Sequence, residues 1–411
     1  MQIQTRAITL LDFAKLAIYG IFLNYYCINI LRGNLLPYGT LVFYLISGAC
    51  VFASILGDQI SVSKEIICWI AYVCFSLITL GFALDSSRAL KGIGEFIQRL
   101  ILIIMIAYIC EKEKSTNFAL RVLAVTAYSC ALSSLLMSED VSKKLTVVSG
   151  ARISTNDIGA LMAFGCFGVL FAFGMRGKTS FFKIVIKIGY ILVAVSVIFI
   201  AGSRKSILAV FLLFGLLFLL CGRDYFKNIS LLQFAFLIIL IIGAIVFAYY
   251  YLLPHVEETD MYQSVFGRRV DDKAQSDAGR IELYEYAIRE FIHSPLVGLG
   301  YNCFSAKYVG YTHSTYVEPL ACSGVGGLLY LIPYVMIFIK QIKLISLNKH
   351  NQQERLWQKE LLVFCFVFLF VGIGIPYMYK DIPCIILAMF IASQRISFDR
   401  LSQADECIHD Q

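Results

Sequence analysis

The chain has 411 residues, of which 59% are hydrophobic and only 15% are charged, and its mean hydropathy is +0.76. Because a soluble domain carries about 25% charged residues, this composition excludes a water-soluble globular protein. The formal charge of +7 comes from 35 basic and 28 acidic residues. Its distribution indicates membrane topology and an anionic ligand, and no nucleic-acid partner is expected.

Apolar runs long enough to cross a membrane recur from one end of the sequence to the other. A hydrocarbon core of roughly 30 Å needs about 20 apolar residues per helix, and lipid offers no partner for unpaired backbone groups. The sequence therefore predicts an all-α integral membrane protein, a polytopic bundle of about 12 transmembrane helices in one domain, residues 1–411. The spans are expected near 11–30, 37–56, 66–84, 97–110, 118–137, 157–175, 184–201, 205–221, 231–252, 314–340, 360–376 and 378–395.

Basic residues gather in alternate links between these spans, which sets the expected orientation. They are Arg176, Lys178, Lys183 and Lys187; Arg223 and Lys227; Lys340, Lys343, Lys349, Arg355 and Lys359. By the positive-inside rule these links, both termini and a short tail of residues 396–411 are cytoplasmic. The large loop of residues 253–312, before the tenth span, is then extracytoplasmic.

This large loop is too long to be structureless in a compact protein. Its stretch "SDAGRIELYEYAIREFIHSPLVGLG" predicts a helix that Asp277 caps and whose periodic part begins at Arg280. Apolar residues then recur at helical spacing, at Ile281, Tyr284, Ile288 and Phe291. Pro295 stops the helix, and the glycines of "PLVGLG" permit a tight turn back to the membrane.

The cytoplasmic side lacks any nucleotide-binding unit. Its longest link, residues 341–359, is too short to fold into such a domain, and no G-x-x-x-x-G-K-[ST] sequence occurs. An ATP-driven pump and a nucleotide-sugar enzyme are therefore not expected, and an activated substrate must already lie in the membrane or outside it. His255 and His293 have no partner at a metal-ligand spacing, so neither a metal nor another cofactor is expected.

Four basic residues lie on the predicted outer face, each beside a span: Arg152, Arg204, Arg280 and His313. One such residue is often only an interfacial anchor, because a long basic side chain can snorkel. Several arginines on the outer face oppose the positive-inside bias, and a guanidinium fork binds diphosphate well. Together they indicate a site that stabilises a diphosphate as it leaves with added charge.

Arg204 follows Ser203 and opens an apolar helix, so its side chain and the free amides of that helix end can face one anion. The neighbouring Lys205 is interpreted as an interfacial anchor rather than as an assisting cation. For Arg152 the anchoring interpretation is nearly as good as a role in binding.

His313 precedes Ser314 and Thr315, either of which can cap a helix, and Pro319 is tolerated near that start. The positive end of a helix dipole disfavours imidazolium and keeps a neutral ring available as a base. Such a ring can take the proton of an attacking sugar hydroxyl. A lone histidine is more often structural, and the spacing alone leaves both interpretations open.

Three stretches, "GSRKSILAV", "GRIELYEYAIREFIHSPLVGLG" and "HSTYVEPLACSGVGG", resemble in this order the O-antigen ligase and polymerase family of polytopic bacterial membrane glycosyltransferases. The resemblance runs from Arg152 to the region of Tyr330, about half of the chain. It implies a donor glycan on undecaprenyl diphosphate, presented at the outer leaflet of the cytoplasmic (inner) membrane. Members are thought to work without metal or nucleotide.

The resemblance also implies residue roles. Arg204 and Arg280 correspond to diphosphate binders, to which Arg152 is added from its position, and His313 to the base that activates an acceptor hydroxyl. The supporting residues are Ser203, Tyr284 and Tyr316. Expected partners are the lipid-linked donor, a glycan acceptor and the bilayer, with a chain-length regulator and other polysaccharide-assembly proteins as further candidates.

The family divides by acceptor, and the motifs do not decide between its branches. A polymerase transfers the glycan to a second lipid-linked repeat unit, as in O-antigen or capsular polysaccharide synthesis, and this activity is favoured. A ligase transfers it to lipid A core or another acceptor. A flippase for the same lipid is a third candidate, but transporters usually place ionisable residues near the membrane midplane, not at the outer edge.

Overall fold

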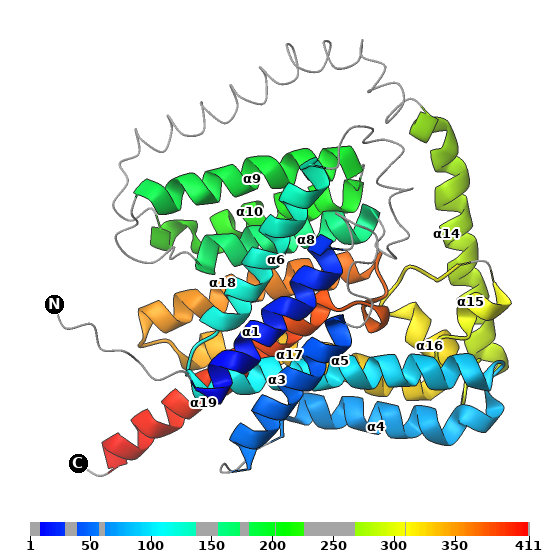
Figure 1. Ribbon diagram of the computed structural model, residues 1–411, viewed down its shortest axis with the longest axis horizontal. Coiled ribbons are helices and arrows are strands. Elements are labelled where there is room, and N and C mark those ends of the chain that lie inside the picture. The colour runs from blue at the N-terminus through cyan, green and yellow to red at the C-terminus, as the bar shows by residue number, and fades with distance from the viewer. Residues whose placement is uncertain are drawn as a thin grey trace.

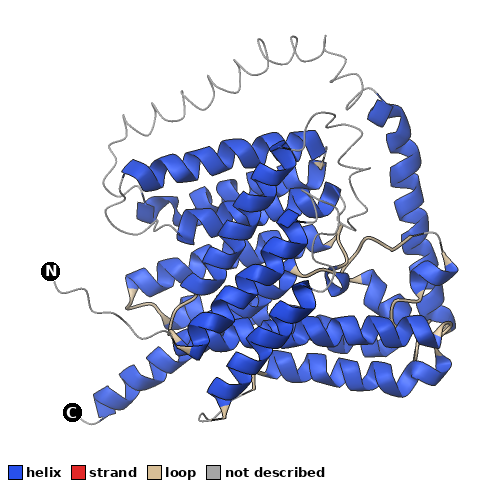
Figure 2. Ribbon diagram, in the orientation of Figure 1, coloured by secondary structure: helices blue, strands red, loops and turns tan. Residues whose placement is uncertain are grey.

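The computed structural model describes residues 9–28, 39–56, 62–136, 155–172, 181–201, 203–225, 268–308 and 310–409. Within these ranges the chain forms helices and no strand, which confirms the all-α class (Figures 1 and 2). The helices are α1 (Leu10–Leu23), continued by a π-helical turn (Asn24–Ile28), α3 (Gly39–Ile55), α4 (Lys64–Ile78), α5 (Ser86–Lys112), α6 (Asn117–Leu136), α8 (Thr155–Ala172), α9 (Phe181–Ala201), α10 (Arg204–Tyr225), α14 (Arg268–His293), α15 (Phe304–Lys307), α16 (Val317–Ser323), α17 (Gly327–Leu347), α18 (Gln352–Gly372) and α19 (Ile382–His409).

Five helical segments among the described residues are long and apolar enough to cross a membrane: 64–82, 86–112, 205–222, 317–347 and 382–403. Shorter apolar helices occupy 39–55, 156–172 and 185–198. Every expected span within the described residues coincides with a helix, whereas the span expected at 231–252 lies outside them. The count of twelve spans stays a prediction.

Two helices are longer than the sequence pattern predicted. The fourth span was expected at 97–110, but α5 begins at Ser86, where the side chain of Asp85 accepts the backbone N–H of Arg88 at 2.9 Å. Charged residues in its first turns interrupt the apolar pattern without interrupting the helix. Residues 396–409, expected as a tail, continue α19.

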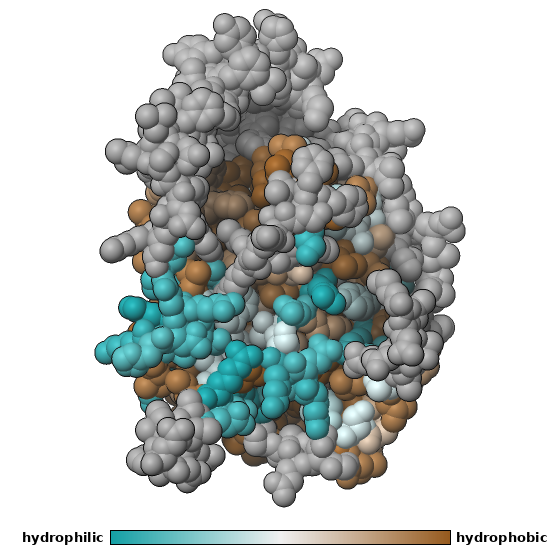
Figure 3. Space-filling view, turned by 90° about the vertical axis from the view of Figure 1, so that its left-hand side faces the viewer, coloured by the Kyte–Doolittle hydropathy of each residue, from teal (hydrophilic) through white to brown (hydrophobic). Residues whose placement is uncertain are grey.

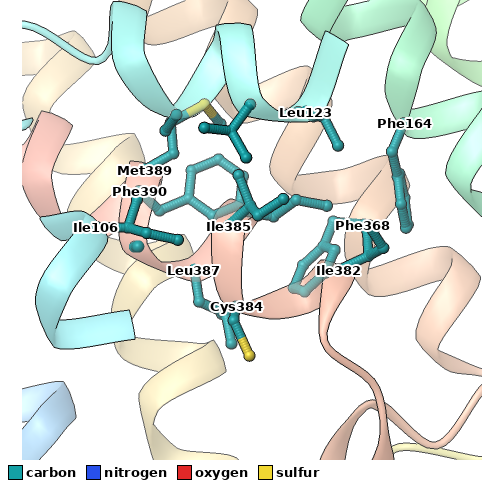
Figure 4. Packing of buried hydrophobic residues seen from close by; sticks show 14 of the residues in the cluster. Ile106, Leu123, Phe164, Phe368, Ile382, Cys384, Ile385, Leu387, Met389 and Phe390 are labelled. Atoms are coloured by element: carbon teal, nitrogen blue, oxygen red, sulfur yellow. The ribbon is translucent and has the colours of Figure 1, made fainter. Parts of the chain in front are cut away.

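The core is organised around α19, the most buried of the five candidate spans. Its segment "IPCIILAMFIA" is apolar on every side, as expected for a helix with neighbours all around it. It packs against α5, α6 and α17. Figure 4 shows Ile385 and Phe390 of α19 among side chains of other helices, such as Leu123 and Phe164.

One end of the molecule, the left-hand side of Figure 1 where α19 ends, is polar. Figure 3 looks onto this end and shows hydrophilic residues gathered over it. Ion pairs link helix ends here, with Arg395 2.9 Å from Glu111 and Arg400 3.0 Å from Glu354. Charged groups at this end are thus paired with one another across different helices.

The helix of the large loop, α14, stands across the opposite side of Figure 1 and runs transverse to α4 and α5 in that view. The loop is thus partly helical, as predicted. The helix stops at His293, before Pro295, as expected, but it begins at Arg268, so Asp277 lies inside it and is not its cap. No helix-breaking residue precedes Gly279 in "RRVDDKAQSDAG", which explains the earlier start.

The turn after α14 packs directly against the end of α16 through backbone groups. The N–H of Gly300 donates to Cys322 O at 2.8 Å, and the N–H of Val325 donates to Pro295 O at 2.7 Å. Gly324 has φ +54°, and a Cβ on it would lie 2.3 Å from Pro295 O. The stretches "PLVGLG" and "CSGVGG" therefore pack against each other through their backbones.

We expect Gly324→Ala to destabilise the protein by about 2 kcal/mol, because a Cβ at this left-handed position meets fixed backbone. Thermal unfolding in detergent, followed by intrinsic fluorescence, measures the change. Gly94→Ala on α5 is the matched control, because nothing lies within 4 Å of the added Cβ. An equal melting temperature for both variants would contradict this packing.

Candidate functional site

The site is built around the last turn of α18 and the link that follows it. The final carbonyls of a helix have no partner within the helix. Here the N–H groups of Ile373 and Gly374 donate to Phe370 O and Val371 O at 3.1 and 3.0 Å. Other nearby carbonyls, from Leu369 to Ile375, accept hydrogen bonds from three different segments of the chain.

The loop that carries His313 is the first of these segments. The backbone N–H of Thr315 donates to Gly372 O at 2.8 Å, and its hydroxyl donates to Ile375 O. The hydroxyl of Tyr316 donates to Leu369 O. Thr315, two residues after His313, therefore attaches the His313 loop to the end of α18.

Helices α14 and α10 are the other two segments. The Tyr284 hydroxyl, one turn after Arg280 on α14, donates to Ile373 O at 2.8 Å. Lys205, in the first turn of α10, brings its Nζ within 3.5 Å of Gly374 O. A Cβ on Gly374 would lie 1.9 Å from that Nζ, so glycine permits the approach.

The predicted supporting residues therefore have structural partners. Tyr284 and Tyr316 fasten their segments to the end of α18, while the buried Ser203, just before α10, shares a hydrogen bond with Ser206 at 2.7 Å between their hydroxyls. The backbone of Arg204 begins α10, as expected. The side chain of Arg204 and all of Arg152 lie outside the described residues.

His313 is half-buried and adopts φ +56°, a left-handed conformation that is uncommon for non-glycine residues. Burial lowers its pKa from the ordinary value of 6.5, and the nearby charges of Arg280, Lys205 and Lys380 lower it further, while Asp157 acts in the opposite direction. The expectation of a neutral ring is therefore supported. The cause is burial among cations, whereas the sequence suggested a helix dipole; α16 begins only at Val317.

Two cavities meet at His313. The first, here called the arginine cavity, has a volume of about 580 Å³ and is lined by Gly279, Arg280, Glu282, Leu283, Tyr286, Lys307, Tyr308 and His313. The second, here called the carboxylate cavity, also holds about 580 Å³. Its lining consists of Tyr25, Thr40, Tyr44, Glu95, Gln98, Arg99, Asn156, Asp157, Asn302, Tyr311, His313, Gly374, Ile375, Pro376, Tyr379, Lys380 and Asp381.

The carboxylate cavity contains charged groups that the sequence analysis did not single out. Lys380 bonds Asp157, at the start of α8, at 2.6 Å. Arg99 of α5 bonds Asp381 at 3.0 Å. Lys205, interpreted as an anchor, lies beside this cavity without lining it: its Nζ reaches Gly374 O, and its charge acts on His313.

A signal for Lys380 was present in the sequence. The residue stands near the outer end of the span expected at 378–395, on the predicted outer side where cations are disfavoured. Its partner Asp157 is more than 200 residues away, so no local pattern links the two. The described residues contain no group of three or more potential metal ligands, and activity without metal stays a prediction.

Residues 189–332, about a third of the chain, match the sequence profile of the family described as O-antigen ligase. This segment includes Arg204, α14 and His313. A search of curated proteins finds no matching relative. This match supports the O-antigen ligase and polymerase family for the segment that contains these residues, and together with the apolar helices it indicates a bacterial membrane protein.

Proposed function

We propose that this protein is a polymerase-type glycosyltransferase that joins lipid-diphosphate-linked oligosaccharide repeat units at the outer face of the cytoplasmic membrane. The observation that carries the proposal is the meeting of Arg280 and His313 in the arginine cavity. An anion-binding group and a neutral base then face the same space, which glycosyl transfer from a diphosphate requires.

The donor enters laterally between helices, and its diphosphate lies against Arg280 and Arg204, with Arg152 as a further contact. His313 takes the proton of the acceptor hydroxyl as that oxygen attacks the anomeric carbon. The bond from this carbon to the diphosphate oxygen breaks, and undecaprenyl diphosphate leaves with the bond electrons. The resemblance to the family suggests inversion at this carbon. The cleaved sugar–diphosphate bond supplies the driving force, so no nucleotide is consumed.

The cations around His313 act on both the histidine ring and the leaving diphosphate. Before the donor binds, they disfavour imidazolium and keep the ring able to accept a proton. A bound diphosphate offsets their charge and makes the imidazolium easier to form. The arginine forks meanwhile stabilise the charge that grows on the leaving group.

A ligase that transfers the glycan to lipid A core or another acceptor is the second candidate. It would use the same diphosphate site and the same base, and the family description favours it by name. The two activities differ only in the acceptor. A flippase is less favoured, because a transporter has no need for a neutral base beside the diphosphate.

We expect Arg280→Ala and Arg204→Ala each to lower glycan transfer about 100-fold or more, because each removes a fork that binds the leaving diphosphate. Arg280→Lys should retain part of the activity, since a lysine keeps the charge but loses the fork. Transfer is measured with purified variants in lipid.

Arg289→Ala is the matched control on α14, because Arg289 is exposed and lies outside both cavity linings. Its activity should stay within about twofold of the unchanged protein, as is usual for surface positions. Near-normal transfer by both arginine variants, with normal membrane insertion, would sink the assignment of the diphosphate site.

The lowered pKa of His313 predicts how transfer depends on pH. The rate should rise as pH increases through this pKa and level off above it, because only the neutral ring accepts a proton. For kcat/KM of the donor, which reports the free enzyme, the midpoint should lie below 6.5. For kcat the midpoint should be higher, since bound diphosphate favours imidazolium.

Lys380→Gln should raise the kcat/KM midpoint, because it removes a cation near His313 and leaves Asp157 without this partner. Lys359→Gln is the control: this lysine is equally exposed, at 26%, and pairs with Asp224. Identical midpoints for kcat and kcat/KM would argue against a diphosphate beside His313.

A single assay separates the candidate activities. Purified protein in lipid, with chelator present, receives one lipid-diphosphate-linked repeat unit, and mass spectrometry follows the glycan. We expect a ladder of longer lipid-linked glycans. Product that appears only after lipid A core is added would identify a ligase, and His313→Ala should abolish either product.

A further inference from the structure

Ion pairs occupy the charged groups of the carboxylate cavity. Arg99 bonds Asp381 at 3.0 Å and lies 3.8 Å from Glu95, and Lys380 bonds Asp157 at 2.6 Å. The lining thus contains three carboxylates and two cations, and both cations are already engaged by the protein. Within the lining itself, an incoming anion would meet one more carboxylate than cations.

The rest of the lining is suited to a sugar. It combines four tyrosines with the amides of Gln98, Asn156 and Asn302. The rings of Tyr311 and Tyr379 lie 4.9 Å apart, and the side-chain oxygen of Asn302 is buried without a hydrogen-bond partner among the described residues. Aromatic faces pack against the C–H face of a sugar ring, while amides and carboxylates bond its hydroxyls. A volume of about 580 Å³ is that of a small-molecule pocket.

The arginine cavity has the opposite charge balance. Its lining contains Arg280 and Lys307 against Glu282, and Lys307 also bonds Glu290, outside the lining, at 2.7 Å. His313 borders both cavities, so a diphosphate in one and a sugar hydroxyl in the other would meet at its ring.

We propose that the carboxylate cavity holds the acceptor sugar and admits a neutral or amino sugar in preference to a uronic acid. Glu95, whose side chain is 38% exposed, supplies an acceptor for a hydroxyl or an ammonium group. A sugar carboxylate would be repelled by it. The identity of the ligand as acceptor rests on the proposed function, whereas binding of the sugar itself does not.

The test measures binding apart from transfer. The full chain in lipid nanodiscs is titrated, under saturation-transfer NMR, with methyl glucoside, galactoside and mannoside, with their uronic acid counterparts, and with methyl glucosaminide. We expect at least one neutral glycoside to bind, and its uronic counterpart to bind at least tenfold more weakly. Tyr311→Ala should weaken binding of the neutral glycoside at least fivefold.

Glu95→Gln should reduce the ratio of the affinity for the neutral glycoside to the affinity for its uronic acid counterpart at least threefold. Glu113→Gln is the matched control, because Glu113 follows the last residue of α5 and is also paired and one-third exposed. Equal or tighter binding of the uronic acids, no binding of any glycoside, or an unchanged titration for Tyr311→Ala would overturn the proposal. Glycoside binding by the unaltered protein, combined with no transfer in the repeat-unit assay, would refute the proposed enzyme activity and leave the proposed sugar cavity standing.

Discussion

The carbonyl groups at the end of α18 are the constraint on which the site depends. A helix end inside a membrane protein must have its backbone groups satisfied by protein, because lipid cannot do so. Here Tyr316, Thr315 and Tyr284 satisfy them, and Lys205 approaches the same turn. The His313 loop, α14 and α10 therefore share one point of reference. A requirement of folding thus sets the relative positions of the segments that carry His313, Arg280 and Lys205.

The sequence predicted the all-α class and many of the described helices, because apolar length and glycine or proline residues are local signals. The helix of the large loop, its end before Pro295 and the start of α10 at Arg204 were all predicted. The sequence did not predict that α14 begins as early as Arg268, or that the polar residues from Ser86 onward belong to α5. Charged residues are compatible with a helix outside the hydrocarbon region. A search for about 20 consecutive apolar residues detects only the part of such a helix that lies in the hydrocarbon region.

The sequence predicted which residue types the candidate site contains better than it predicted how they contact one another. Arg280 and His313 were identified from residue type and predicted side, and the structure brings them to one cavity. Lys205 was interpreted as an anchor, because a lysine beside a span usually is one. Its approach to Gly374, and the pairing of Lys380 with Asp157, depend on contacts between distant segments. Periodicity along a chain does not contain such information.

The order of synthesis gives the end of α18 one more consequence. Lys205, Tyr284 and Thr315 all leave the ribosome before Leu369, the first of the carbonyls that this turn offers to them or their neighbours. Until that turn is in place, the segments that carry His313 and Arg280 have no common point of attachment. A nascent chain can therefore hold every residue assigned to chemistry and still lack an assembled site. The contacts that join these segments can therefore form only after the turn from Leu369 to Ile375 is in place.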